Sequence, residues 1–206
     1  ADEIVFLDIS ASTDKRDILI DVVARTASEI FIPFTVGGGV RSVADISRIL
    51  ANGADKVALN TNAVLDPGLV SLASGEFGAQ CVVVAVDAKW NGEFYEVFIY
   101  GGRRGTGMDV MAWVKRCEEL GCGEILLTSI ERDGTKSGFD TRLIREVSGC
   151  VNVPVIASGG ARDQKDFFDA FMAGADAALA ASIFHYGKYT VGEIKEFLKK
   201  KGVVVR

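Results

Sequence analysis

The sequence predicts an α/β fold, a (βα)₈ barrel built from two half-barrel repeats, with seven of the eight strand–helix units present. Short segments rich in Val, Ile, Leu and Ala barely alternate with polar residues, as parallel strands buried on both faces do. Amphipathic segments with helical periodicity separate them. Polar or glycine residues follow nearly every apolar segment, at the end of the strands where barrel enzymes carry out their chemistry.

The strands are expected to follow one another along the chain with a helix after each. In order they are residues 3–9, 33–39, 56–61, 82–89, 124–130, 154–160 and 177–184. Residues 90–107 are a longer insertion after the fourth strand and are expected to hold a small hairpin. An open doubly wound sheet is the competing architecture. It is disfavoured because no early strand is followed by the G-x-G-x-x-G motif of a dinucleotide-binding sheet.

An internal repeat favours the barrel over the open sheet. A shift of 121 residues places residues 33–61 on 154–182 with eight identities in 29 positions and no gap. The partner of strand 82–89 would then lie before residue 1. We therefore expect residues 1–206 to form one barrel domain that lacks its N-terminal strand and helix, since a complete barrel has eight units and about 250 residues.

Composition excludes other classes of protein. The 206 residues carry a net charge of −5, with 49% hydrophobic and 25% charged residues, which is typical of a packed globular domain and argues against a nucleic-acid binder. No apolar run is long enough to cross a membrane, and no signal peptide is visible, so a cytoplasmic protein is expected. Cys81, Cys117, Cys122 and Cys150 form no C-x-x-C pair and His185 is the only histidine, so neither a metal site nor a cofactor is expected.

Two glycine-rich loops are candidate phosphate sites. VGGGVRS and SGGARDQ each join a strand to a helix, where glycine allows close backbone approach and the helix start offers free N–H groups. The following strands add Asn60 and Thr61 in one half and Ala181 and Ser182 in the other. The alternative is that the glycines only make tight turns. Two such loops at symmetric positions favour an elongated substrate with a phosphate at each end.

Three acids at strand ends could take part in chemistry. Asp87 ends a Val/Ala run and is a candidate general acid or base, because desolvation raises the pKa of a carboxyl group. Its alternative is a structural acid paired with Lys89 or an arginine. Asp8 is a second possible catalytic acid, although capping a helix or holding a loop is more common. Asp133, followed by Gly134, either lines the second phosphate pocket or simply makes a turn.

Charged residues also stand at the opposite ends of the strands. Glu3, Lys56 and Glu124 lie at the N-terminal ends of three of the predicted strands. Such charges usually face water at the bottom of a barrel, but a ring of them around the axis could gate something that enters from below. His185, just after the last strand, is more consistent with a structural residue than with a site residue.

Taken together, these segments resemble the cyclase subunit family of imidazole glycerol phosphate synthase, from histidine biosynthesis. The matching segments are VFLDIS, PFTVGGGVRS, GADKVALNT, VVVAVDAK, GGRRGTG, GEILLTSIERDGTKSGFD, PVIASGGA and GADAALAASIFH. The resemblance implies ring closure on a bis-phosphorylated phosphoribulosyl-formimino carboxamide ribotide. The ammonia for it would come from a glutaminase partner in a heterodimer, and no cofactor would be needed. The related isomerase of the same pathway, or a non-catalytic fragment or engineered scaffold, is the alternative.

The resemblance also implies roles for individual residues. One catalytic aspartate of the family matches Asp87, and the other would lie in the missing unit, so this chain alone is expected to be inactive. The phosphate contacts map onto Gly39, Asn60, Thr61, Asp133, Gly134, Gly160, Ala161, Ala181 and Ser182. Glu3, Lys56 and Glu124 match a charged ammonia gate, whose arginine would also be in the missing strand. Asp55 matches a position that faces the glutaminase.

Overall fold

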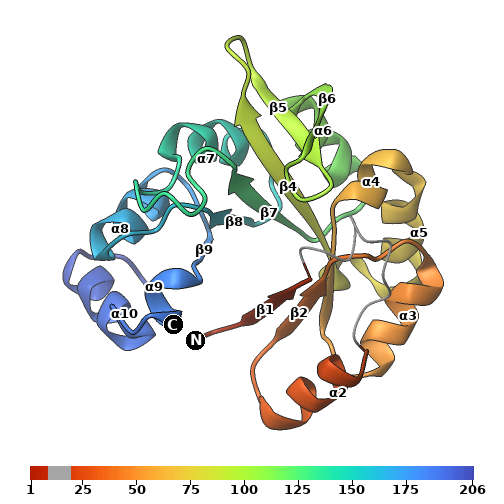
Figure 1. Cartoon of the computed structure of the whole chain (residues 1–206), viewed down its shortest axis with the longest axis horizontal. Coiled ribbons are helices and arrows are strands. Elements are labelled where there is room, and N and C mark those ends of the chain that lie inside the picture. The colour runs from red at the N-terminus through yellow and green to blue at the C-terminus, as the bar shows by residue number, and fades with distance from the viewer. Residues whose placement is uncertain (9–19) are drawn as a thin grey trace.

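The structure is a computed structural model that describes residues 1–8 and 20–206. Seven parallel strands pair in the order β1-β2-β3-β4-β7-β8-β9 and curl into a barrel-like sheet with the helices outside (Figure 1). The strands are β1 (Ile4–Leu7), β2 (Phe34–Gly37), β3 (Lys56–Leu59), β4 (Val82–Trp90), β5 (Tyr95–Ile99), β6 (Arg104–Asp109), β7 (Glu124–Ser129), β8 (Val155–Ser158) and β9 (Ala177–Leu179). The α/β barrel class and the strand order are as predicted.

Helices follow the parallel strands and cover the outer face of the sheet (Figure 1). They are α2 (Ile20–Glu29), α3 (Val43–Ala51), α4 (Thr61–Leu65), α5 (Gly68–Phe77), α6 (Val110–Glu119), α7 (Thr141–Ser148), α8 (Gln164–Met172), α9 (Ser182–His185) and α10 (Val191–Lys200), with a 3₁₀ turn, η1 (Ala79–Cys81), before β4. In the part of the chain that is described, no helix has the length and apolar character needed to cross a bilayer.

The strands bury both of their faces, which explains why their sequences barely alternate. One face packs against the helices in a large core that includes Val36, Val57 and Ile125. The other face forms a small cluster inside the curl of the sheet, with Ala58, Val83 and Leu126 at its centre and Val5, Ala85, Ile156 and Leu179 packed around it. Apolar residues are therefore needed at successive positions of each central strand.

The sequence repeat is also a repeat of backbone contacts. Asp55 exchanges hydrogen bonds with the backbone of Phe34: its N–H donates to the Phe34 carbonyl, and its carboxylate accepts from the Phe34 N–H, both at 2.8 Å. Asp176 makes the same pair of bonds with Val155, both at 2.9 Å. Each aspartate thus fixes the amino end of a strand, and the two lie 121 positions apart.

Close backbone packing repeats at the other end of the same strands. Gly38 and Gly159 both have positive φ. A Cβ atom at Gly38 would lie 2.2 Å from the Asp8 carbonyl oxygen, and one at Gly159 would lie 2.9 Å from the Ser129 carbonyl oxygen. Only glycine fits so close to a neighbouring strand end. Asp8 and Ser129 are themselves equivalent in the repeat.

The sequence makes predictions about both the insertion after the fourth predicted strand and the end of the last strand. The insertion does form a hairpin, in which β5 pairs with an extended β4 and β6 pairs with β5. The predicted strand 177–184 is wrong beyond Leu179, because the N–H groups of Phe184 and His185 bond back to the Ala181 carbonyl and start a helix. Ile183 then packs into the core with 4% of its surface exposed. Residue 9 of the first predicted strand lies outside the described residues.

The first and last strands of the curl do not pair with each other among the described residues. β1 and β9 face one another across an opening, and the two ends of the chain lie near it (Figure 1). The Lys195 ammonium of α10 bonds to the Asp2 carboxylate at 2.7 Å, which links the last helix to the segment before β1. This partly exposed ion pair is a contact between the two ends of the curl.

We predict that Asp176→Ala lowers the free energy of unfolding by about 1 kcal/mol, because the Val155 N–H loses its acceptor at a strand end. Urea denaturation measures the change. Asp169→Ala is the matched control, since the Asp169 carboxylate makes only a surface ion pair with Lys165, which is worth at most about 0.5 kcal/mol. Equal losses in the two variants would contradict the role assigned to Asp176.

Candidate active site

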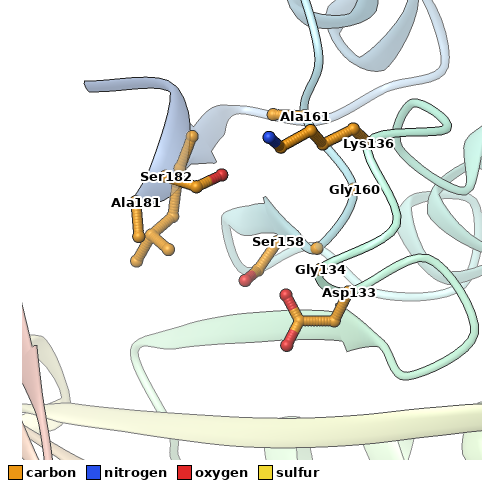
Figure 2. A pocket seen from close by; sticks show the side chains of 11 residues that line it. Asp133, Gly134, Lys136, Ser158, Gly160, Ala161, Ala181 and Ser182 are labelled. Atoms are coloured by element: carbon orange, nitrogen blue, oxygen red, sulfur yellow. The ribbon is translucent and has the colours of Figure 1, made fainter. Parts of the chain in front are cut away.

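A pocket of about 170 Å³ opens at the carboxyl ends of β7, β8 and β9 (Figure 2). It brings together all six residues that the sequence assigned to the second phosphate site. The residues that line it are Asp133, Gly134, Lys136, Ser158, Gly159, Gly160, Ala161, Leu179, Ala180, Ala181 and Ser182. They come from three separate loops, so the pocket exists only because parallel strands end at the same edge of the sheet.

A backbone hydrogen bond joins two of the loops that form this pocket. The Gly138 N–H donates to the Gly160 carbonyl at 2.8 Å, which fastens the loop after β7 onto the glycine loop after β8. A Cβ atom at Gly160 would lie 2.4 Å from the Gly138 carbonyl oxygen. Substitution of Gly160 would therefore displace the loop as well as block a ligand.

The helices with uncapped N–H groups are not the ones that directly follow the glycine loops, as the sequence predicted, but the short helices one βα unit later in the chain. The helices that directly follow the glycine loops are already capped, α3 by the Ser42 hydroxyl and α8 by the Asp163 carboxylate. By contrast, the N-cap residues of α4 and α9 are Asn60 and Ala181, and neither makes a side-chain cap hydrogen bond. At each predicted phosphate site it is therefore the short helix after the next strand that presents N–H groups unoccupied by a side chain.

The first predicted phosphate site is built differently from the second. Gly39 has a φ of 71° at the end of the first glycine loop. Thr61 is 5% exposed, and its hydroxyl accepts a hydrogen bond from the Tyr100 N–H at 2.9 Å. The loop between β5 and β6 is thereby attached to this side of the site, which the sequence did not indicate.

Asp87 lies between the two halves. Its backbone pairs with Thr128 of β7 on one side and with Phe98 of the hairpin on the other. Burial raises the pKa of the Asp87 carboxyl to about 6, a hydrogen bond from Asn60 lowers it in part, and the nearby charge of Asp133 raises it again. A residue of each predicted phosphate site thus acts on the same carboxyl group.

The other residues near the strand ends make contacts of their own. Lys89 does not pair with Asp87; its ammonium lies over the Phe98 ring, 6.0 Å from the centroid. Asp8 directly follows β1, and its N–H donates to the Gly37 carbonyl at 2.9 Å. His185 is exposed at the end of α9 and does not line the pocket.

A charged cluster occupies the amino ends of the strands. The Lys56 ammonium bonds to the Glu3 carboxylate at 2.9 Å and to that of Glu124 at 2.5 Å. Burial opposes its charge, but the two carboxylates outweigh burial and raise the pKa of Lys56. Glu124 Oε2 is buried and has no hydrogen-bond partner among the described residues. Asp55 is exposed at this same end of the sheet.

Lys136 is the charged pocket residue that the sequence analysis did not single out. It follows the Asp133-Gly134 turn in the segment SIERDGTKSG, and a lysine in a strand-end loop was a usable signal. Its backbone has a φ of 55°, which no sequence pattern reveals for a lysine. Among residues 1–8 and 20–206, no group of three His, Cys, Asp or Glu side chains could hold a metal ion.

Comparison with known proteins identifies the family. Residues 1–190 match the family described as "Histidine biosynthesis protein". The chain is 58% identical over 205 residues to imidazole glycerol phosphate synthase subunit HisF of Pyrococcus furiosus. This alignment covers 100% of this chain and 82% of the relative. HisF subunits of Thermococcus onnurineus and Thermococcus gammatolerans are each 57% identical, again over 100% of this chain and 81% of the relative. The chain belongs to the HisF family.

Membership confirms the resemblance drawn from the sequence. The chain is an enzyme subunit of the cyclase step in histidine biosynthesis, and the isomerase alternative is not favoured. The relatives' names call each of them a synthase subunit, so those proteins act within a complex.

We predict that Asp87→Asn stabilises the fold above neutral pH. A pKa near 6 against 3.8 for the free side chain means that folding favours the protonated acid. The contribution of Asp87 to stability is therefore complete below about pH 4 and lost as pH rises through 6. The amide side chain of the variant does not ionise and is not subject to this loss. The free energy of unfolding of the variant should therefore exceed that of wild type by up to about 3 kcal/mol at pH 8 and by little at pH 4.

Urea denaturation at pH 4, 6 and 8 measures this difference. Asp133→Asn serves as the control: removing the neighbouring charge should lower the pKa of Asp87, which NMR titration of its carboxyl carbon can follow. A stability difference between Asp87→Asn and wild type that does not change with pH would contradict the assignment.

Proposed function

We propose that the carboxyl end of this barrel binds a bis-phosphorylated phosphoribulosyl-formimino carboxamide ribotide and closes its imidazole ring with ammonia. The products would be imidazole glycerol phosphate and aminoimidazole carboxamide ribotide. The observation that carries the proposal is Asp87, a half-buried carboxyl group with a pKa near 6, set between Asn60 of one glycine-loop site and Asp133 of the other. A group with this pKa can accept and donate a proton near neutral pH.

Each phosphate would bind to one half of the repeat. Gly160, Ala161, Ala181 and Ser182 would hold one phosphate, supported by the pocket that they line and by the uncapped start of α9. Gly39, Asn60 and Thr61 would hold the other, supported by the equivalent uncapped start of α4. Held at both ends, the substrate would present its reacting atoms to Asp87, and such fixed geometry supplies much of the rate in reactions of this kind.

The proton transfers would need two acids. Asp87 would be one, and in the family pattern the second stands at the end of a strand preceding β1. Asp8, at the end of β1 itself, is the possible second acid within this chain. The curl is open between β1 and β9 among the described residues, and we propose that an eighth βα unit closes it in the active barrel.

The amino end of the barrel would receive ammonia from a glutaminase subunit. Glu3, Lys56 and Glu124 would form the gate, supported by the ion pairs that hold the Lys56 ammonium between two carboxylates. The unpartnered Glu124 Oε2 fits a further cation, as the arginine of the family's gate would supply. We also propose the cytoplasm as the compartment, since all four cysteines are free thiols.

Replacement of the candidate acid tests the chemistry. In a barrel completed by an N-terminal βα unit of the family, Asp87→Asn should lower ammonia-dependent kcat by about 10² or more and leave KM within a few-fold, because the amide cannot transfer the proton. Product formation from the bis-phosphate and an ammonium salt is the assay. Near-normal turnover would reduce Asp87 to a structural role, and turnover by residues 1–206 alone would contradict the need for an eighth unit.

The repeat offers a matched test of the partner face. Asp55→Ala and Asp176→Ala remove the same strand-end hydrogen bond, so both should cost about 1 kcal/mol of stability. Only Asp55→Ala should also weaken glutaminase binding, by roughly tenfold, if its exposed carboxylate contacts the partner. Titration calorimetry with the glutaminase subunit measures the affinity. An equal effect of the two variants would remove Asp55 from the interface.

A further inference from the structure

We propose that Lys136 is the cation that binds the phosphate in the pocket at the ends of β7, β8 and β9, and that Tyr186 holds it at the mouth of the pocket until phosphate arrives. This rests on the proposed phosphate sites and adds to them the residue that gives the second site its charge.

The charge balance of the pocket requires such a residue. Asp133 is the other ionisable side chain that lines the pocket, and its carboxylate disfavours an anion. A phosphate monoester is close to a dianion at neutral pH. Without a positive side chain, the uncapped N–H groups alone would have to overcome its repulsion by Asp133. Lys136 supplies the one positive side chain among the lining residues.

Neighbouring cations are already committed to other partners. The Arg132 guanidinium donates to the Ser137 hydroxyl at 3.2 Å. Arg162 pairs with Asp163 at 3.1 Å and with Asp166 at 3.3 Å, and the Lys188 ammonium donates to the Arg162 carbonyl at 2.8 Å. These contacts fix loops and cap helices. None of these three side chains lines the pocket.

Lys136 has no carboxylate partner among the described residues. Its ammonium lies over the ring of Tyr186, 5.8 Å from the centroid. Figure 2 shows the side chain extending from the loop after β7 toward the α9 side of the pocket, where Ser182 lies. A cation over an exposed aromatic ring is held weakly, whereas a charge-assisted bond to phosphate is stronger, so the ligand can take the ammonium from the ring.

The backbone supports a functional reason for this placement. Lys136 and Tyr100 are the two non-glycine residues with positive φ in the described chain. The strain at Lys136 is imposed by the loop around it, in which Thr135 Oγ1 donates to the Arg132 carbonyl at 2.6 Å and Gly138 bonds to Gly160. A lysine in a conformation that suits glycine or asparagine better is retained at a cost, as is common at ligand sites.

The test uses ¹⁵N-labelled chain titrated with inorganic phosphate. Amide shifts of Gly160 and Ser182 report the second site, and those of Gly39 and Asn60 report the first as an internal control. Lys136→Asn, which keeps a residue suited to positive φ, should raise the Kd at Gly160 and Ser182 roughly tenfold and leave that at Gly39 and Asn60 unchanged. Lys136→Arg should stay within about threefold of wild type.

Tyr186 provides a second pair of variants. Tyr186→Phe keeps the ring and should bind phosphate as wild type does, whereas Tyr186→Ala should weaken binding about two- to threefold. Melting temperatures of Lys136→Asn and Lys136→Gly should equal or exceed that of wild type, a result that a merely structural lysine would not give.

The outcomes separate the two proposals. Wild-type affinity at Gly160 and Ser182 in Lys136→Asn would overturn the role of Lys136 and leave the phosphate site standing. No response to phosphate at either pair of amides in wild type would overturn the phosphate sites and this inference together. A fall in affinity at both pairs of amides would show a general loss of structure and would also count against Lys136.

Discussion

Close packing of glycine backbone against a neighbouring strand end determines the shape of the site. Gly38 rests on the carbonyl of Asp8, and Gly159 rests on that of Ser129, at distances that leave no room for a Cβ atom. Because the chain can approach so closely, each loop turns inward over the mouth of the barrel before its helix begins. The strand that follows then ends beside the loop, and its short helix presents uncapped N–H groups there. A side chain at either glycine would push its loop away from the neighbouring strand end.

The charged groups at the two ends of the barrel are arranged differently. At the amino end, the Lys56 ammonium is held between the carboxylates of Glu3 and Glu124, so one positive group faces two negative ones. At the carboxyl end, Asp87 is half-buried near the like charge of Asp133, which keeps its pKa near 6 at the expense of stability above neutral pH. The acids at the amino end are thus ion-paired to a lysine, whereas Asp87 has its pKa shifted toward neutrality, which is typical of groups that transfer protons.

The features that the sequence predicted are those that depend on local pattern. Doubly buried strands, the repeat, Asp87 and the residues of the second pocket follow from apolar runs and from positions at strand ends. The missed features depend on individual hydrogen bonds and packing contacts, some local and some between distant residues, that the apolar pattern does not show. Asp163 caps α8 and removes N–H groups that seemed free, Tyr100 reaches Thr61 from the hairpin, and the loop around Lys136 imposes its positive φ. The early end of β9 at Leu179 likewise depends on Ile183 packing into the core.

The halves of the repeat share a backbone but have diverged in what covers each site. In the first half, the β5–β6 loop is fastened to Thr61, and Asn60 bonds to Asp87, so this predicted phosphate site is tied directly to the Asp87 carboxyl. In the second half, an exposed lysine stands over an open pocket and is held by an aromatic ring. Two identical sites would accept a bis-phosphate in either direction. In the proposed reaction only one orientation would bring the reacting atoms to Asp87. The asymmetry between a tied site and an open, cationic one would supply the physical difference that orients the proposed substrate.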